Sequence, residues 1–163
     1  MYKHFAYSEM LARGLKPISH SDDECHFLKS DEVEEITDLS ERLSSIAGMV
    51  LVAIDGHNSD FGWNNSDNLV ETPQYFITIM KNSPVGDIEA AHLVKEECKS
   101  VAFEVVKKML LDREADQDGM GFLNPDTITF RGVGPIADNF YGLMIGFNMQ
   151  EPKKFMLNPE MWL

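Results

Sequence analysis

The sequence has little cysteine and no long apolar run. Its two cysteines, Cys25 and Cys98, lie far apart, which is typical of reduced intracellular proteins and not of disulfide scaffolds. No apolar run approaches the ~20 residues that a membrane-spanning helix needs. No apolar stretch with a small-residue cleavage site follows residues 1–5, so we expect no secretory signal. These absences predict a soluble protein of the cytoplasm.

Basic residues are also scarce. Lys and Arg number 14 against 27 Asp and Glu, which gives a formal net charge of −13. Nucleic-acid binding draws its affinity from Lys and Arg that neutralise phosphates, so this chain is poorly suited to bind DNA directly. An anionic membrane surface would repel it in the same way. We therefore expect protein partners, no direct sequence-specific contact with nucleic acid, and no membrane.

The remaining composition fits one globular domain. The chain has 163 residues, of which 44% are hydrophobic and 25% charged, and a chain of this length buries about two-thirds of the surface that its unfolded form exposes. No internal repeat or linker is visible. We expect a single domain over residues 1–163, in which residues 1–30 form an N-terminal helix and connection, residues 31–149 an α+β core, and residues 150–163 an apolar C-terminal extension.

Three stretches have the apolar spacing of helices. Residues 5–15 contain Gly14 near their end, and a glycine at that place commonly stops a helix. Residues 31–46 begin with Asp31 and Glu34 at the spacing of a capping box. Residues 87–111 form the longest stretch. The apolar positions of the second helix are Val33, Ile36, Leu39, Leu43 and Ile46, and those of the third are Ile88, Ala91, Val94, Cys98, Val101, Val105 and Met109, widened by Ala102 and Leu110.

Four stretches have the patterns of strands. Residues 49–54 are continuously apolar and rich in β-branched side chains, whereas residues 74–80 alternate. Residues 127–133 and 140–149 flank a glycine- and proline-containing turn at 134–139, which suggests an antiparallel pair. The sequence therefore predicts an α+β fold, with a mainly antiparallel sheet of about four strands packed against one long helix and one or two shorter helices.

The segment 55–73 is polar and long for a loop in a compact domain. Loops longer than about 12–15 residues usually have a function, so this segment is the leading candidate for a functional surface. It can equally be a hairpin whose aromatic pair, Phe61 and Trp63, packs back onto the sheet. Residues 151–163 are too apolar to be a tail that stays in solvent. They either fold back onto the domain or bind a neighbouring subunit.

Two clusters resemble metal sites but lack the required spacing. Residues 20–26 contain two histidines, one cysteine and three acids, yet no zinc pattern, and we interpret them as a solvated acidic turn. A calcium loop starting at Asp116 would place Met120 and Thr127 where oxygen ligands are required, including a glutamate. We predict no metal and no cofactor.

Motifs for nucleophilic or phosphate chemistry are missing from the sequence. Cys98 lies on the apolar stripe of the long helix, where a buried, unreactive thiol is expected. There is no nucleophile elbow or phosphate-binding loop. A hydrolase that uses His57 with Asp55 and Asp60 remains an alternative, although Asp55 can equally cap the turn after its strand through its side chain.

Two local sequences, together with the order of elements, resemble a known family. They are Tyr75-Phe76-Ile77-Thr78-Ile79-Met80-Lys81, followed by the long helix, and Val133-Gly134-Pro135-Ile136-Ala137-Asp138-Asn139-Phe140-Tyr141-Gly142, which leads into the last strand. The chain resembles bacteriophage or prophage tail-completion proteins of the tail-terminator kind, especially those in prophages of gut Bacteroidetes. The likeness covers residues 31–149 in the order of elements and includes no diagnostic motif.

The resemblance implies a sheet backed by helices and assembly into a ring, typically hexameric, that contacts tail-tube and head-connector proteins in a virion. It implies no catalytic residues. An acidic chain also suits a ring around DNA, because negative charge lets DNA slide. The aromatic residues Phe61, Trp63, Phe155 and Trp162 are then candidate interface anchors. The alternative is a small bacterial accessory domain that binds a partner or ligand through residues 55–73.

Overall fold

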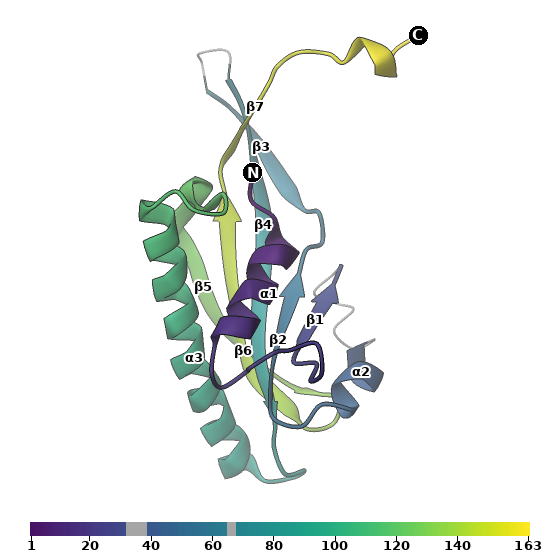
Figure 1. Cartoon of the computed structure of the whole chain (residues 1–163), viewed down its shortest axis with the longest axis vertical. Coiled ribbons are helices and arrows are strands. Elements are labelled where there is room, and N and C mark those ends of the chain that lie inside the picture. The colour runs from purple at the N-terminus through teal and green to yellow at the C-terminus, as the bar shows by residue number, and fades with distance from the viewer. Residues whose placement is uncertain (32–38, 65–67) are drawn as a thin grey trace.

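The structure is a computed structural model, which describes residues 1–31, 39–64 and 68–163. Three α-helices and seven strands follow one another in a mixed order (Figure 1). The helices are α1 (His4–Gly14), α2 (Ser40–Ser44) and α3 (Ile88–Glu114), and the strands are β1 (Phe27–Ser30), β2 (Met49–Ile54), β3 (Ser59–Asn64), β4 (Asn68–Asn82), β5 (Leu123–Ile136), β6 (Phe140–Met149) and β7 (Glu151–Lys153). The predicted α+β class is confirmed.

The strands form one sheet with the order β1-β2-β4-β6-β5, to which β3 and β7 are added along β4. The β1–β2 pair is parallel, whereas β2–β4, β4–β6 and β5–β6 are antiparallel. The expectation of a mainly antiparallel sheet of about four strands is therefore wrong, because the sheet is mixed and has seven strands. The additional strands are either very short or polar, so they carry little of the hydrophobic alternation by which a strand is predicted.

Strand β4 runs through the whole length of the sheet. Its C-terminal half lies between β2 and β6, and its N-terminal half lies between β3 and β7. We call the part made by β3, residues 68–73 and β7 the arm. The arm projects beyond the helices at one end of the molecule (Figure 1). The segment 55–73, predicted as a long loop, thus contains β3 and the beginning of β4, which agrees with the hairpin alternative.

The sheet buries a different set of side chains on each face. On one face Leu51, Ile79 and Ile145 pack in a core with residues of α1 and α3. On the other face Val52 and Met80 pack with residues of α2 and with the hairpin between β5 and β6. All six residues of β2 are buried, which explains why its sequence is continuously apolar rather than alternating.

Helix α3 begins at Asp87, whose side chain accepts a hydrogen bond from the backbone N–H of Ala90. Most of the predicted stripe is buried, from Ala91 to Met109. The first position, Ile88, is an exception because its side chain is exposed, and Leu110 is only partly covered. The prediction is therefore correct for the middle of the buried face of α3, but it placed the ends of that face too far along the helix in both directions.

The predicted helix over residues 31–46 is only partly within the described part of the chain. Residues 32–38, which include Val33, Glu34 and Ile36, lie outside it. Helix α2 covers Ser40–Ser44, and its Leu43 is fully buried beside Leu39. Leu39 and Leu43 therefore face the core as predicted, and Ile46, which lies beyond the end of α2, is partly buried against the same core.

The N-terminal residues are fastened to β4 by a buried histidine. His4 Nε2 lies 2.9 Å from the carbonyl oxygen of Phe76, and the Tyr2 hydroxyl lies 2.9 Å from His4 Nδ1. The His4 ring also stacks on Tyr75, with ring centroids 4.7 Å apart. Burial lowers the pKa of His4 to about 4, so the imidazole is neutral at pH 7. One ring thus joins the start of α1 to the centre of the sheet.

After β7 the chain leaves the sheet. Residues 154–163, which we call the C-terminal segment, extend from the end of the arm and include a short 3₁₀ turn at Pro159–Met161 (Figure 1). The Asn158 side chain caps that turn by accepting a hydrogen bond from the N–H of Glu160. Within the residues that the structure describes, no helix is both long enough and apolar enough to cross a membrane.

Candidate interaction surface

The arm and the C-terminal segment meet through two aromatic rings. Trp63 of β3 and Phe155 contact each other edge to face, with ring centroids 5.0 Å apart and ring planes at 74°. This geometry is one of the two that aromatic pairs prefer. Two of the four predicted interface residues, which lie far apart in the sequence, are therefore neighbours in space.

All four predicted interface residues are exposed. The exposed fractions are 64% for Phe61, 51% for Trp63, 70% for Phe155 and 67% for Trp162. The aromatic pair of β3 thus does not pack back onto the sheet. Further exposed apolar side chains of the C-terminal segment are Met156, Leu157, Met161 and Leu163. Single exposed apolar residues are normal, but a gathering of this kind is typical of interaction sites.

A cluster of charges fixes the root of the C-terminal segment. Lys153 Nζ lies 2.9 Å from Glu151 Oε2 and 3.1 Å from Glu71 Oε2, and Ser59 Oγ donates a hydrogen bond to Glu71. Burial acts to raise the pKa of Glu71, but the hydrogen bonds from Lys153 and Ser59 outweigh it and lower that pKa. The four side chains join all three strands of the arm. The C-terminal segment therefore starts from a fixed position.

His57, the residue of the hydrolase alternative, lies in the connection between β2 and β3. Its ring is exposed, its φ is +54°, and its Nδ1 lies 3.2 Å from Asp55 Oδ1. The same Asp55 oxygen accepts a hydrogen bond from the His57 backbone N–H. Asp55 thus caps the turn through its side chain, the simpler role considered for it. Asp60 lies on β3 with its side chain exposed.

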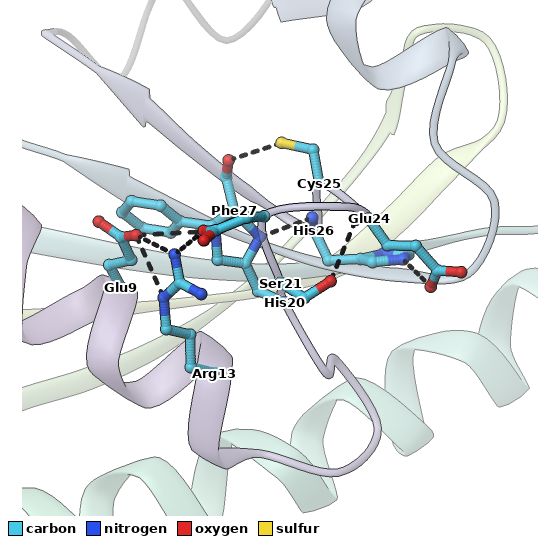
Figure 2. A network of polar contacts seen from close by, with 9 residues as sticks. Glu9, Arg13, His20, Ser21, Glu24, Cys25, His26 and Phe27 are labelled. Atoms are coloured by element: carbon cyan, nitrogen blue, oxygen red, sulfur yellow. Dashed lines mark hydrogen bonds and ion pairs between the residues drawn. The ribbon is translucent and has the colours of Figure 1, made fainter.

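The histidines and acids of residues 20–26 form a network that spans α1, the connection and β1 (Figure 2). Arg13 Nη2 contacts Glu9 Oε1 at 2.9 Å and Asp22 Oδ1 at 2.7 Å. His20 Nδ1 accepts a hydrogen bond from the backbone N–H of His26, and His26 Nδ1 lies 2.9 Å from the carbonyl oxygen of Met49. Both rings therefore serve as structural links to the backbone.

The acids of this network are solvated as predicted, since the side chain of Asp22 is 91% exposed and that of Glu24 is 77% exposed, whereas the two histidines are more buried. The side chain of His20 is only 10% exposed and that of His26 only 17%. Figure 2 shows the Cys25 sulfur directed to the carbonyl oxygen of Phe27, at 3.3 Å. Over residues 1–31, 39–64 and 68–163, no group of three or more His, Cys, Asp or Glu side chains is arranged to hold a metal ion.

The acidic run at the C-terminal end of α3 and in the turn that follows also has a structural role. Asp112 is buried, accepts a hydrogen bond from the Tyr7 hydroxyl at 2.8 Å, and contacts Lys108 Nζ at 2.6 Å. Asp116 and Asp118 have positive φ values in the turn that follows α3. Burial, and then the hydrogen bond to Asp112, raise the pKa of Tyr7. The Tyr7–Asp112 contact holds α1 against α3.

Beside that contact lies an apolar groove that the sequence did not predict. It has a volume of about 230 Å³ and lies between the C-terminal half of α1 and the middle of α3. Its apolar lining comes from Met10, Leu11, Leu15 and Val105, and the charged residues at its edge are Glu104 and Lys108. Met10 is exposed at this groove, and Leu15 is partly covered.

The two cysteines are not bridged and Cys98 is buried, as predicted. Both are free thiols, with Cys25 exposed and Cys98 buried. Burial raises the pKa of Cys98 to about 12, which keeps that thiol protonated at neutral pH. Cys98 is therefore a core residue of α3.

No protein-family model matches the chain, and no curated protein matches it either. The resemblance to tail-completion proteins therefore stays a prediction.

Sequence reasoning identified the exposed aromatic residues but missed two features. The Glu71–Lys153–Glu151 cluster joins residues far apart in the chain, and no local pattern indicates that they meet. The groove was not predicted for a different reason, because the helical spacing of an apolar residue such as Met10 does not show whether its side chain is buried or exposed.

Proposed function

We propose that this protein is a non-enzymatic assembly protein, which self-associates into a ring through its arm and C-terminal segment. The observation that supports this most is the set of exposed aromatic side chains on that surface, Phe61, Trp63, Phe155 and Trp162. Large aromatic residues on exposed surfaces are the residue types that anchor protein interfaces. Their burial between copies would remove them from water.

The placement of this surface at one end of the molecule supports a ring. A contact between one end of a copy and a different surface of the next copy is head-to-tail, and such contacts give rings when the rotation closes. The arm and the C-terminal segment extend away from the helices (Figure 1), so they can reach a neighbour. The net charge of −13 suits a ring that lets DNA pass without binding it.

The biological setting in this proposal is a prophage tail. It rests on the resemblance of residues 75–81 and 133–142 to tail-completion proteins of the tail-terminator kind. In that setting the ring contacts tail-tube and connector proteins, and the protein is a component of the virion. The alternative, an accessory domain that binds a partner through residues 55–73, uses the same arm but needs no self-association.

Sedimentation velocity tests the proposal. The wild-type chain is compared with a Phe61→Ser, Trp63→Ser variant and with a control, Val85→Ser, Ile88→Ser, which removes exposed apolar side chains near the start of α3. We expect wild type and control to sediment as the same oligomer, and the arm variant to shift towards the monomer. A monomeric wild type at micromolar concentration would refute ring formation and favour the accessory-domain alternative.

A further inference from the structure

The chain carries an unburied apolar segment and an unfilled apolar groove at different places. The C-terminal segment exposes Leu157, Met161 and Trp162 beyond the arm. The groove between α1 and α3, on the body of the molecule, is lined by Met10, which is exposed, and by Leu15, which is partly covered. We infer that the C-terminal segment of one copy binds in the α1–α3 groove of the next copy. This inference rests on the proposed function and specifies the contact that forms the ring.

The size and lining of the groove suit an aromatic side chain. An apolar cavity of about 150 Å³ is large enough to bind a benzene ring, and this groove has about 230 Å³. Its lining is mainly aliphatic, from Met10, Leu11 and Val105. Trp162 and Leu157 are therefore guests of suitable size and polarity.

The charges at the edge of the groove already have partners. Lys108 Nζ contacts Asp112 at 2.6 Å, and Glu104 Oε1 contacts Lys107 at the same distance. An ionic guest would have to compete with these pairs, whereas an apolar guest would leave them intact. The Tyr7–Asp112 hydrogen bond fixes α1 relative to α3, so the groove is preformed. Preformed sites bind with less loss of conformational entropy.

The occupant is a second copy because the C-terminal segment points away from its own groove. The segment starts at the fixed Lys153 cluster, and Figure 1 shows it leaving the arm in the direction away from α1 and α3. A donor segment and an acceptor groove at different places on one chain make a head-to-tail contact. Each copy in a ring then gives one segment and receives another.

A mixing experiment with two full-length variants tests this inference. The segment variant is Leu157→Ser, Met161→Ser, Trp162→Ser. It leaves the groove intact but removes the apolar side chains that would bind in it. The groove variant is Met10→Glu, Leu15→Glu. It leaves the C-terminal segment unchanged but places negative charge in the groove. We expect each variant alone to dissociate, with the dissociation constant raised at least ~100-fold because three large side chains lose their burial. Mixed together, the two variants should form 1:1 pairs that do not grow further.

The outcomes separate the inference from the proposed function. If wild type assembles and either variant assembles equally well, the groove contact is refuted, whereas ring formation by another contact stands. If wild type is a monomer, the proposed function and the inference fail together. Two variants that dissociate alone and do not pair when mixed also refute the inference, provided that circular dichroism shows both to be folded.

A crosslinking measurement covers the case in which the groove variant does not fold. Met10→Cys and Trp162→Cys are placed together in a Cys25→Ser background, where Cys98 is buried. Oxidation should link chains into covalent oligomers that reducing agent dissolves. A disulfide formed only within single chains would show that the segment binds its own groove, and absence of any disulfide would show that it binds elsewhere; either result refutes the inference. The control is Ile88→Cys with Trp162→Cys, for which we expect no link.

Discussion

The rings of Trp63 and Phe155 lie edge to face, with 5.0 Å between their centroids. Trp63 belongs to β3, and Phe155 follows β7, so this contact joins the two strands that flank the first half of β4. Both rings also remain exposed. The contact therefore sets the direction in which the C-terminal segment leaves the arm without burying either ring completely.

Trp63→Ala should loosen the start of the C-terminal segment. An edge-to-face aromatic pair contributes about 0.5–1.5 kcal/mol beyond its buried area, so we expect the open state of β7 to become about 2–10 times more populated. Hydrogen exchange of the β7 amides measures this population. Phe61→Ala is the matched control, because it removes an aromatic ring from the same strand and leaves Trp63 and Phe155 in place. Equal exchange in both variants would show that the ring contact does not hold the segment.

Tyr7→Phe should destabilise the whole fold. The variant removes the donor to the buried Asp112 carboxylate, and a hydrogen bond to a charged group contributes about 1.5–3 kcal/mol. Urea denaturation measures the loss in the free energy of unfolding. The control is Lys107→Met, which breaks an exposed pair with Glu104 and should cost less than ~1 kcal/mol. Similar losses for the two variants would contradict the structural role of the Tyr7–Asp112 contact.

His4 should make stability depend on pH below neutrality. Its pKa is lowered to about 4 from the ordinary histidine value of 6.5, so between these values the unfolded chain binds a proton that the folded chain does not. Stability is therefore full above pH 6.5 and falls as the pH drops towards 4, by about 3 kcal/mol.

The His4 contribution can be separated from that of the carboxylates by comparing variants. We expect the stability difference between wild type and His4→Gln, measured by urea denaturation, to be about 3 kcal/mol larger at pH 7 than at pH 4. His92→Gln, which changes an exposed histidine of α3, should show no such change. A pH-independent difference for His4→Gln would indicate that His4 is not held neutral in the folded protein.

Gly142→Ala should be strongly destabilising. A Cβ at Gly142 would collide with the backbone carbonyl oxygen of Ile79 on β4, which cannot move aside without breaking the pairing of β4 with β6. We expect a loss of about 2–3 kcal/mol in the free energy of unfolding. Gly62→Ala on β3 is the control, because nothing lies within 4 Å of a Cβ there. Comparable thermal denaturation of the two variants would contradict the close approach of β6 to β4.

The part of the fold that the sequence predicted is the part with a clear apolar pattern. Strand β2 is continuously apolar, and the middle of β4, strand β6 and the buried face of α3 also have apolar patterns, because their side chains enter one of the two cores. Strands β3 and β7 lie in the arm, outside both cores. Their residues have no buried apolar face to mark them, so the sequence left the segment 55–73 open between a long loop and a hairpin.

The candidate surface was predicted in part for a related reason. Phe61, Trp63, Phe155 and Trp162 are conspicuous because they are aromatic residues in polar or irregular segments. The sequence could not show that Trp63 meets Phe155, nor that Lys153 joins Glu71, because pairing between distant strands depends on register. The groove beside Met10 was not predictable, since an exposed apolar position on a helix has the same spacing as a buried one.

Native mass spectrometry of the wild-type chain over a range of concentrations shows whether copies of the chain close into a ring. We expect one oligomeric mass, a fixed multiple of the chain mass, that stays constant as the concentration rises because the ring is closed. A monomer at every concentration would refute the ring. A ladder of species that lengthens with concentration would contradict it as well, since it would mean that the head-to-tail contact does not close.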